Sequence, residues 1–190
     1  MHGADATQGS GQYDTMSAAL PELPPGLPEN QLAIRRAVLG LCRTMQWAAI
    51  NEFSLPNAGR RADIMALLPD HSLTCIEIKS GIRDFQTDQK WTDYRSWSDR
   101  LFFAVDDSFP LSLLPVDVGV IVVSLNMLPE SLRNTVVAEC AIVREPEAHK
   151  LAPARRRTLL HLFATMAANR LMSLEDPAIT ASLRAARRTE

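Results

Sequence analysis

The chain has 190 residues, of which 46% are hydrophobic and 22% are charged, and its formal net charge is −2. This length suits one domain with a buried core and is too short for two ordinary domains. The longest apolar runs, such as residues 118–123, fall far short of the roughly 18 to 20 residues of a membrane-spanning helix, so we expect no membrane partner. The N-terminus has no basic patch followed by an apolar stretch, so we expect no secretory signal and a cytoplasmic location.

Composition divides the chain into three parts. Residues 1–28 are rich in Gly, Ser, Ala and Pro and have little apolar periodicity, which predicts a disordered leader. We expect one folded domain over residues 29–175 and a basic tail over residues 176–190. Three scattered cysteines lie in apolar segments, which favours reduced, buried thiols over a disulfide framework or a zinc site. They are Cys42, Cys75 and Cys140.

The first half of the domain is expected to form a helix followed by three strands. Asn30 is a suitable N-cap for a helix over residues 30–49, whose apolar residues share one face. The turn-prone segment 69–72 joins the last two strands as an antiparallel hairpin. Apolar alternation between turn signals places the strands at 50–55, 61–68 and 73–79.

The second half alternates helices and strands. A helix is expected from Asp84 or Thr87 to about residue 98, and a short helix or turn after Asn126. Strands are expected at 101–105, 116–124 and about 136–144. Pro153 suits the first turn of a last helix with an apolar stripe formed by Leu159, Leu162, Phe163, Met166 and Leu171. The order α-β-β-β-α-β, with extra strands and a C-terminal helix, predicts an α/β fold with a mixed central sheet flanked by helices.

Two acidic residues and a lysine can converge in the hairpin. The hairpin brings Asp63 close to Glu77, and the two-residue period of a strand puts Glu77 and Lys79 on one face. Asp63 shares that face if the connecting loop or a bulge gives the right register. Together with the backbone carbonyl of Ile78, the two carboxylates make a set of hard oxygen ligands suited to Mg²⁺ or Mn²⁺.

The lysine is an unusual choice for this chain. Only three of its twenty basic residues are lysines and the rest are arginines, yet Lys79 stands beside the acidic pair. A metal at this place can polarise a phosphodiester and activate a bound water. Lys79 could orient that water or stabilise charge in the transition state. The alternative is an ordinary Glu/Lys pair on a strand surface.

Neighbouring residues could assist. On the expected second helix, Gln86 and Lys90 are four residues apart, so they share a face and could reach a phosphate or the attacking water. Trp91 and Tyr94 could stack on bases, although such aromatic residues more often belong to the core. Glu52 in the first strand is either a further metal ligand or an exposed glutamate at a strand end.

Arginines gather in four places and suit either phosphate contacts or a solvated surface. These places are 35–36, 60–61, 155–157 and 184–188. With a net charge near neutral, any attraction to nucleic acid depends on such local clusters and not on the overall field.

Several segments of the chain match one known pattern in the same order. They are 59–66, 76–80, Asp84 to Trp91, Tyr94-Arg95, 99–105 and 149–156. In these segments the chain resembles the MmcB-like family of bacterial DNA repair proteins, over about residues 30–175. One departure is Ala62, which stands where a proline often precedes the aspartate corresponding to Asp63; that proline is dispensable in the wider superfamily.

The resemblance implies a restriction-endonuclease-like core of the PD-(D/E)XK superfamily, with Asp63, Glu77 and Lys79 as its active site. It also implies a DNA repair protein, linked to mitomycin C-type damage, that acts as a Mg²⁺-dependent nuclease on damaged or branched DNA. The first alternative is a non-catalytic module of the same fold that binds DNA or a repair-protein partner. The second is a small metabolic or regulatory protein with an incidental Glu-x-Lys. RNA is an alternative nucleic acid, and the sequence gives no indication of the oligomeric state.

Overall fold

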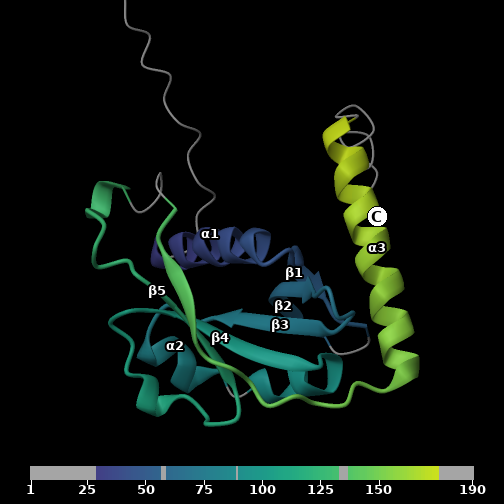
Figure 1. The fold of residues 1–190 in the computed structure, drawn as a ribbon, viewed down its shortest axis with the longest axis horizontal. Helices are drawn as coiled ribbons and strands as arrows, with labels where there is room; N and C mark the ends of the chain where they lie inside the picture. The colour runs from purple at the N-terminus through teal and green to yellow at the C-terminus, as the bar shows by residue number, and fades with distance from the viewer. Residues whose placement is uncertain (1–28, 57–58, 89, 133–136, 176–190) are drawn as a thin grey trace, which may run out of the picture.

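A computed structural model describes residues 29–56, 59–88, 90–132 and 137–175, whose centre is one six-stranded sheet (Figure 1). In spatial order its strands are β1 (Ala48–Ser54), β2 (Arg61–Leu67), β3 (Leu73–Ile78), β4 (Arg100–Asp106), β5 (Gly119–Val123) and β6 (Cys140–Arg144). The β3–β4 and β4–β5 pairs are parallel, and the other three pairs are antiparallel. The predicted mixed sheet of a restriction-endonuclease-like core is therefore confirmed.

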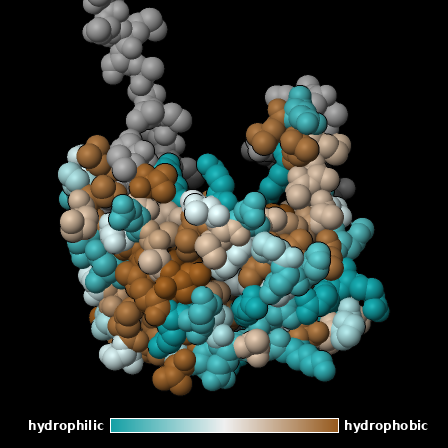
Figure 2. All heavy atoms as spheres, viewed as in Figure 1, coloured by the Kyte–Doolittle hydropathy of each residue, from teal (hydrophilic) through white to brown (hydrophobic). Residues whose placement is uncertain are grey.

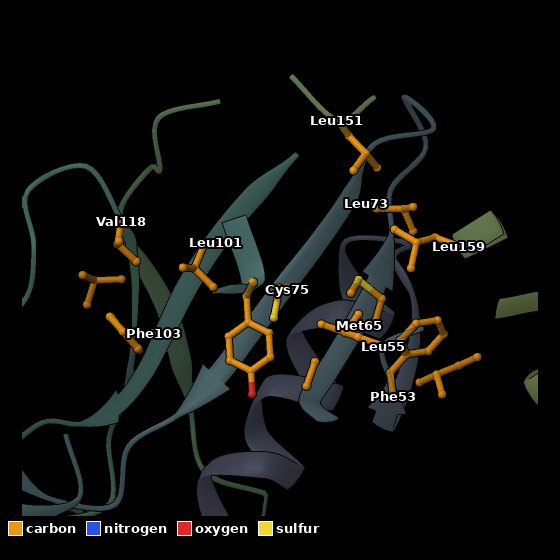
Figure 3. Packing of buried hydrophobic residues seen from close by; sticks show 14 of the residues in the cluster. Phe53, Leu55, Met65, Leu73, Cys75, Leu101, Phe103, Val118, Leu151 and Leu159 are labelled. Atoms are coloured by element: carbon orange, nitrogen blue, oxygen red, sulfur yellow. The ribbon is translucent and has the colours of Figure 1, made fainter. Parts of the chain in front are cut away.

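Helices cover both faces of the sheet. They are α1 (Glu29–Thr44), α2 (Ile82–Thr87) and α3 (Pro153–Glu175), with the 3₁₀ helices η1 (Trp91–Trp97), η2 (Leu111–Leu113) and η3 (Glu130–Leu132). The α1 helix packs Ile34 and Val38 against one face, on strand residues such as Ile76 and Phe102. On the opposite face, η1 and the first half of α3 close a second cluster (Figure 3), which includes Phe53, Met65, Cys75, Leu101, Phe103 and Leu159.

The first helix ends five residues earlier than predicted. It stops at Thr44 because Gln46 adopts a left-handed φ of 56°. The N–H of Gln46 donates to the Arg43 carbonyl at 3.1 Å, and the N–H of Trp47 donates to the Cys42 carbonyl at 2.8 Å. These two bonds form a Schellman cap, which satisfies the last helical carbonyls. Glycine usually takes this position, so a glutamine there gave no stop signal.

The single helix predicted from Asp84 or Thr87 to residue 98 is wrong. The chain forms α2, passes through Asp88 in an extended conformation, and then forms η1. One oxygen of the Asp88 carboxylate accepts the N–H of Lys90 at 2.9 Å, and the other accepts Nζ of Lys79. An aspartate that bonds to nearby backbone in this way offers an alternative to the helical ladder, so the helix breaks at Asp88.

The fifth strand is also shorter than the predicted 116–124. It begins at Gly119, and Val116 lies outside it with 86% of its surface exposed. A side chain at Gly119 would meet the ring of Phe102 at 2.5 Å, so this strand can pack against β4 only with a glycine there. The predicted short helix after Asn126 corresponds to η3.

Only the first half of α3 belongs to the core. Leu159 and Phe163 are buried, whereas Leu171, predicted to continue the apolar stripe, is 56% exposed. Figure 1 shows the reason, because α3 continues well beyond the sheet. Figure 2 shows apolar side chains among polar ones along this projecting end; those of Leu171, Met172 and Leu174 are exposed. No helix within the described residues is long and apolar enough to cross a membrane.

The buried carboxylate of Asp99 links α3 to the start of β3 through hydrogen bonds. The Asp99 side chain accepts the N–H of Leu73 at 2.8 Å and receives two bonds from the Arg156 guanidinium, at 2.6 and 2.9 Å. The backbone N–H of Asp99 donates to the Leu73 carbonyl at 2.7 Å. Both oxygens of this carboxylate are thus satisfied, as a buried anion requires.

The predicted burial of the cysteines is confirmed for two of the three. Cys42 and Cys75 are buried, Cys140 is partly buried, and all three are free thiols. Burial raises the pKa of each of these thiols, which keeps them protonated and unreactive.

Some predictions concern parts of the chain that lie outside the described residues. These parts are the predicted leader at 1–28, the tail at 176–190 with its arginines, and the first residue of the 136–144 strand.

Candidate active site

The β2–β3 ladder opens at the acidic pair. The last paired residues at this end are Ile64 and Ile76, so Asp63 and Glu77 would form the next pair. Their side chains replace the missing ladder bonds. The Asp63 N–H donates to Oε1 of Glu77 at 3.2 Å, and the Ile78 N–H donates to Oδ2 of Asp63 at 2.9 Å. The predicted convergence of the two carboxylates is therefore present.

Burial of this pair leaves its negative charge poorly solvated. Glu77 is 5% exposed, and burial followed by the nearby Asp63 charge raises its pKa to about 8. Burial also raises the pKa of Asp63, although the Ile78 N–H and the Arg35 guanidinium oppose that rise. Burial thus raises the pKa of both facing carboxylates, and the Asp63 charge raises that of Glu77 further, so a bound cation would stabilise their ionised forms.

Lys79 lies on the same side of β3 as Glu77, as the strand alternation predicted. Its Nζ is 5.9 Å from the centre of the Phe103 ring, and Glu77 lies beside Cys75 in the same cluster. Only 4% of Lys79 is exposed, and its Nζ donates to Oδ2 of Asp88 at 2.5 Å. Burial alone would raise the pKa of Asp88, but the bonds from Lys79 and from the Lys90 N–H lower it.

A buried arginine borders the site on the side of α1. Nη1 of Arg35 lies 2.6 Å from Oε1 of Glu52, and its Nη2 lies 3.1 Å from Oδ1 of Asp63. The second oxygen of Glu52 meets Nε of Arg61 at 2.5 Å. The register places Glu52 directly across β1–β2 from Asp63, and Glu52 has a left-handed φ of 53°. Both oxygens of Glu52 are therefore engaged by guanidinium groups.

The other predicted site residues occupy different places. Gln86 and Lys90 are exposed, and they do not share a helix face because α2 ends at Thr87. The N–H of Ile78 points across to Asp63, and the carbonyl of a strand residue projects to the same side as its N–H. The Ile78 carbonyl thus faces the opening between β2 and β3.

The aromatic residues after the site are core residues, as the more usual reading of them predicted. Tyr94 is buried, and its hydroxyl donates to the Arg61 carbonyl at 3.2 Å. Trp91 packs edge-on against Phe103, with ring centres 5.5 Å apart, and Arg95 lies over the Trp91 ring. These contacts hold η1 against β2 and β4.

The sequence reasoning missed the part that Arg35 and Asp88 play in the site. Arg35 precedes Val38 and Cys42 by three and seven residues, so helical periodicity could have placed it on the buried face. Its acidic partners lie in β1 and β2, and such tertiary pairing has no local signal. Asp88 was expected inside a helix, and its contact with Lys79 depends on the break in that helix.

The donor atoms suit a hard divalent cation such as Mg²⁺ or Mn²⁺. In the part of the chain that the structure describes, no three His, Cys, Asp or Glu side chains form a group arranged to hold an ion. A metal would therefore depend on Asp63, Glu77 and the backbone carbonyl of Ile78, with water completing its shell. Mg²⁺ commonly keeps several waters and uses one or two carboxylates, so this small donor set fits it.

Comparison with protein families gives a clear result. The model of the family described as "DNA repair protein MmcB-like" matches residues 19–178. The chain belongs to the MmcB-like family. A solved structure similar to this MmcB-like chain is SPO1766, a protein of unknown function from Silicibacter pomeroyi, with 39% identity and a TM-score of 0.66. The match covers 81% of this chain and 95% of that one. A comparison with curated proteins found no match.

Proposed function

We propose that this MmcB-like DNA repair protein is a divalent-metal-dependent nuclease that hydrolyses phosphodiester bonds in damaged or branched DNA. The observation that carries the proposal is the opening of the β2–β3 ladder, where Asp63 and Glu77 face one another with raised pKa values. Such a carboxylate pair costs stability in the metal-free protein, and a catalytic cation is a direct reason to keep it. The same arrangement supports placing the fold in the PD-(D/E)XK superfamily.

Asp63, Glu77 and the Ile78 carbonyl would hold the ion. A bound Mg²⁺ or Mn²⁺ would supply Lewis-acid polarisation of the scissile phosphate and a more acidic bound water. Asp63 is already oriented for this role, because its Oδ2 is fixed by the Ile78 N–H. Glu77 is fixed by the Asp63 N–H and must release its proton when the ion binds.

Lys79 would act on the attacking water. Its ammonium group has three donors, of which one is directed to Asp88, so two remain to orient a water or to contact the phosphate. Asp88 holds Nζ in place at the end of β3 and thereby limits the motion of a flexible side chain. The exposed residues Gln86 and Lys90 would contact the nucleic-acid backbone beside the site.

Glu52 has a separate role in this proposal. Because both of its oxygens already meet guanidinium groups, we assign it to the ion pairs beside the site and not to the metal. Its position opposite Asp63 still makes it part of the site's electrostatics.

A cleavage panel tests the proposal. Wild type is incubated with duplex, single-stranded, nicked and branched DNA, and with matching RNA, in Mg²⁺ or Mn²⁺. We expect cleavage of at least one DNA substrate and a loss of roughly 100-fold or more in Asp63→Asn and Glu77→Gln. Glu145→Gln, which makes the same change at an exposed glutamate, is the matched control and should keep full activity. Absence of cleavage in wild type, or full activity in Glu77→Gln, contradicts the proposal.

A non-catalytic module that binds DNA or a repair protein is the second candidate. It is favoured by the pairing of Asp63 with Arg35 and of Lys79 with Asp88, since these contacts partly neutralise the cluster internally. Survival of cells after DNA damage separates the two functions. If Glu77→Gln protein accumulates normally and restores full resistance, the binding module is correct; loss of resistance supports the nuclease.

A further inference from the structure

Arg35 is placed between two carboxylates beside the proposed metal site. It is 9% exposed, and its two terminal nitrogens divide between Glu52 on β1 and Asp63 on β2. A guanidinium stays protonated in proteins, so this charge is permanent. The Asp63 carboxylate consequently has a cation at Oδ1 and the Ile78 N–H at Oδ2, while Glu77 accepts the backbone N–H of Asp63.

Many phosphodiester-cleaving sites place a second metal ion beside the first, with a shared carboxylate between them. Here the Oδ1 side of Asp63, where a second ion would lie, is occupied by the Arg35 side chain. Building on the proposed nuclease function, we propose that Arg35 is an internal cation that takes the place of a second divalent ion. The protein then binds one divalent ion per chain, held by Asp63 and Glu77.

Formal charges support a count of one ion. Glu52, Asp63 and Glu77 carry −3 when ionised, and Arg35 with Arg61 contributes +2, which leaves −1. One divalent ion changes this sum to +1, and a second would change it to +3 around Arg35, Asp63 and Glu77, which are mostly buried. Repulsion of that size in a medium of low dielectric opposes the second ion for as long as Arg35 remains.

Arg35 is a positioning residue in this account, because it acts through Asp63 and contacts no reacting atom. Its charge sets the number of ions, and its fork orients Asp63 from the side opposite the Ile78 N–H. A purely structural role in joining α1 to β1 and β2 would give a different result, since metal stoichiometry would then not depend on its charge.

Isothermal titration with Mn²⁺ alone, near pH 8, tests the inference. The proteins are wild type, Arg35→Lys, Arg35→Met and Arg156→Met, the last removing a similarly paired arginine remote from the site. We expect one ion per chain in wild type, Arg35→Lys and Arg156→Met. We expect Arg35→Met to bind a second ion between Glu52 and Asp63. Glu52→Gln should still bind one ion, and a count of zero would overturn the assignment of that ion to Asp63 and Glu77.

The outcomes separate this inference from the proposed function. Wild type that binds no Mn²⁺ overturns both. One ion in wild type and still one in folded Arg35→Met overturns the internal-cation role alone, and so does a count of two in wild type or in Arg35→Lys. If Arg35→Met does not fold, Arg35→Gln takes its place as the uncharged variant: two ions support the internal-cation role, and one ion overturns it.

Discussion

The two ends of β3 each bury a carboxylate next to a guanidinium, and they differ in what remains unsatisfied. At the first end, Asp99 receives both bonds of the Arg156 fork and the Leu73 N–H. At the other end, Asp63 and Glu77 face one another. Of these two carboxylates, Arg35 binds only that of Asp63, and its other terminal nitrogen binds Glu52. The two ends use similar residue types, but the second end has more carboxylates for each guanidinium than the first.

This difference separates a structural carboxylate from a candidate functional one. A buried anion that only maintains the fold is expected to find full compensation within the protein. Asp99 does so and joins α3 to the sheet. Glu77 instead has a pKa raised by burial and by the Asp63 charge, so the metal-free site keeps a proton where a cation could bind. The experiments below test this contrast at one end or the other.

The largest effect is expected from Glu77→Gln in the metal-free protein. The pKa of Glu77 rises on folding from 4.5 to about 8, so the native state binds the extra proton and wild-type stability falls as pH rises across this interval. Gln keeps an oxygen for the Asp63 N–H and cannot ionise. The substitution should therefore stabilise the protein at pH 8 by roughly 3 to 5 kcal/mol, at about 1.4 kcal/mol per unit of pKa shift.

Urea unfolding at several pH values in the presence of a chelator measures this gain. It should shrink steadily toward pH 4.5 and vanish below it, where Glu77 is protonated in both the folded and the unfolded protein. A gain that is absent, or equal at every pH, would show that Glu77 is not a destabilised buried acid.

At the other end of β3, Arg156→Met should destabilise the protein. Removing the guanidinium leaves the Asp99 carboxylate with one backbone donor, and a broken buried pair typically costs 3 to 5 kcal/mol. Because the Arg156 side chain is about one-third exposed, we expect a smaller loss of about 2 kcal/mol. The midpoint of urea unfolding checks this value. The increase in midpoint on adding Mn²⁺ should match that of wild type, and a reduced increase would mean that the two ends of β3 are coupled.

The smallest effect is expected from Asp88→Asn, which leaves Lys79 without its paired carboxylate. Because Asn keeps an oxygen that can accept a bond from Nζ of this buried lysine, we expect a loss of only about 1 kcal/mol at neutral pH. The pKa of Asp88 is lowered on folding, since the bonds from Lys79 and the Lys90 N–H outweigh burial. Its stabilising contribution is therefore present above the ordinary aspartate pKa and disappears as pH falls through the lowered value. Acid titration of both proteins by circular dichroism should show their stabilities converging below about pH 4.

Sequence reasoning was sufficient for the part of the site that depends on strand geometry. The 69–72 turn fixed an antiparallel hairpin, and alternation placed Glu77 and Lys79 on one face. The hairpin also predicted that Asp63 lies close to Glu77, but the register that puts Asp63 on the same face was left open by the sequence and comes from the structure. These inferences succeeded because a hairpin determines which residues lie opposite one another. The roles assigned to these residues remain proposals.

The features that were missed depend on single side chains that override a pattern. Gln46 ends α1 in a conformation usually given to glycine, and Asp88 breaks a helix that periodicity would continue. Arg35 reaches Glu52 and Asp63 across elements that are adjacent only in the folded protein. No local window contains both partners of such a contact, so the internal cation became visible only in three dimensions.

The most direct test of the central claim is an NMR titration of the Glu77 side-chain carboxyl with and without Mg²⁺. Without the ion, we expect a pKa of about 8. With saturating Mg²⁺ the pKa should fall well below its ordinary value, because the ion favours the ionised carboxylate. A pKa near 4.5 in the metal-free protein that does not change with Mg²⁺ would contradict the claim that this end of β3 is built to receive a cation.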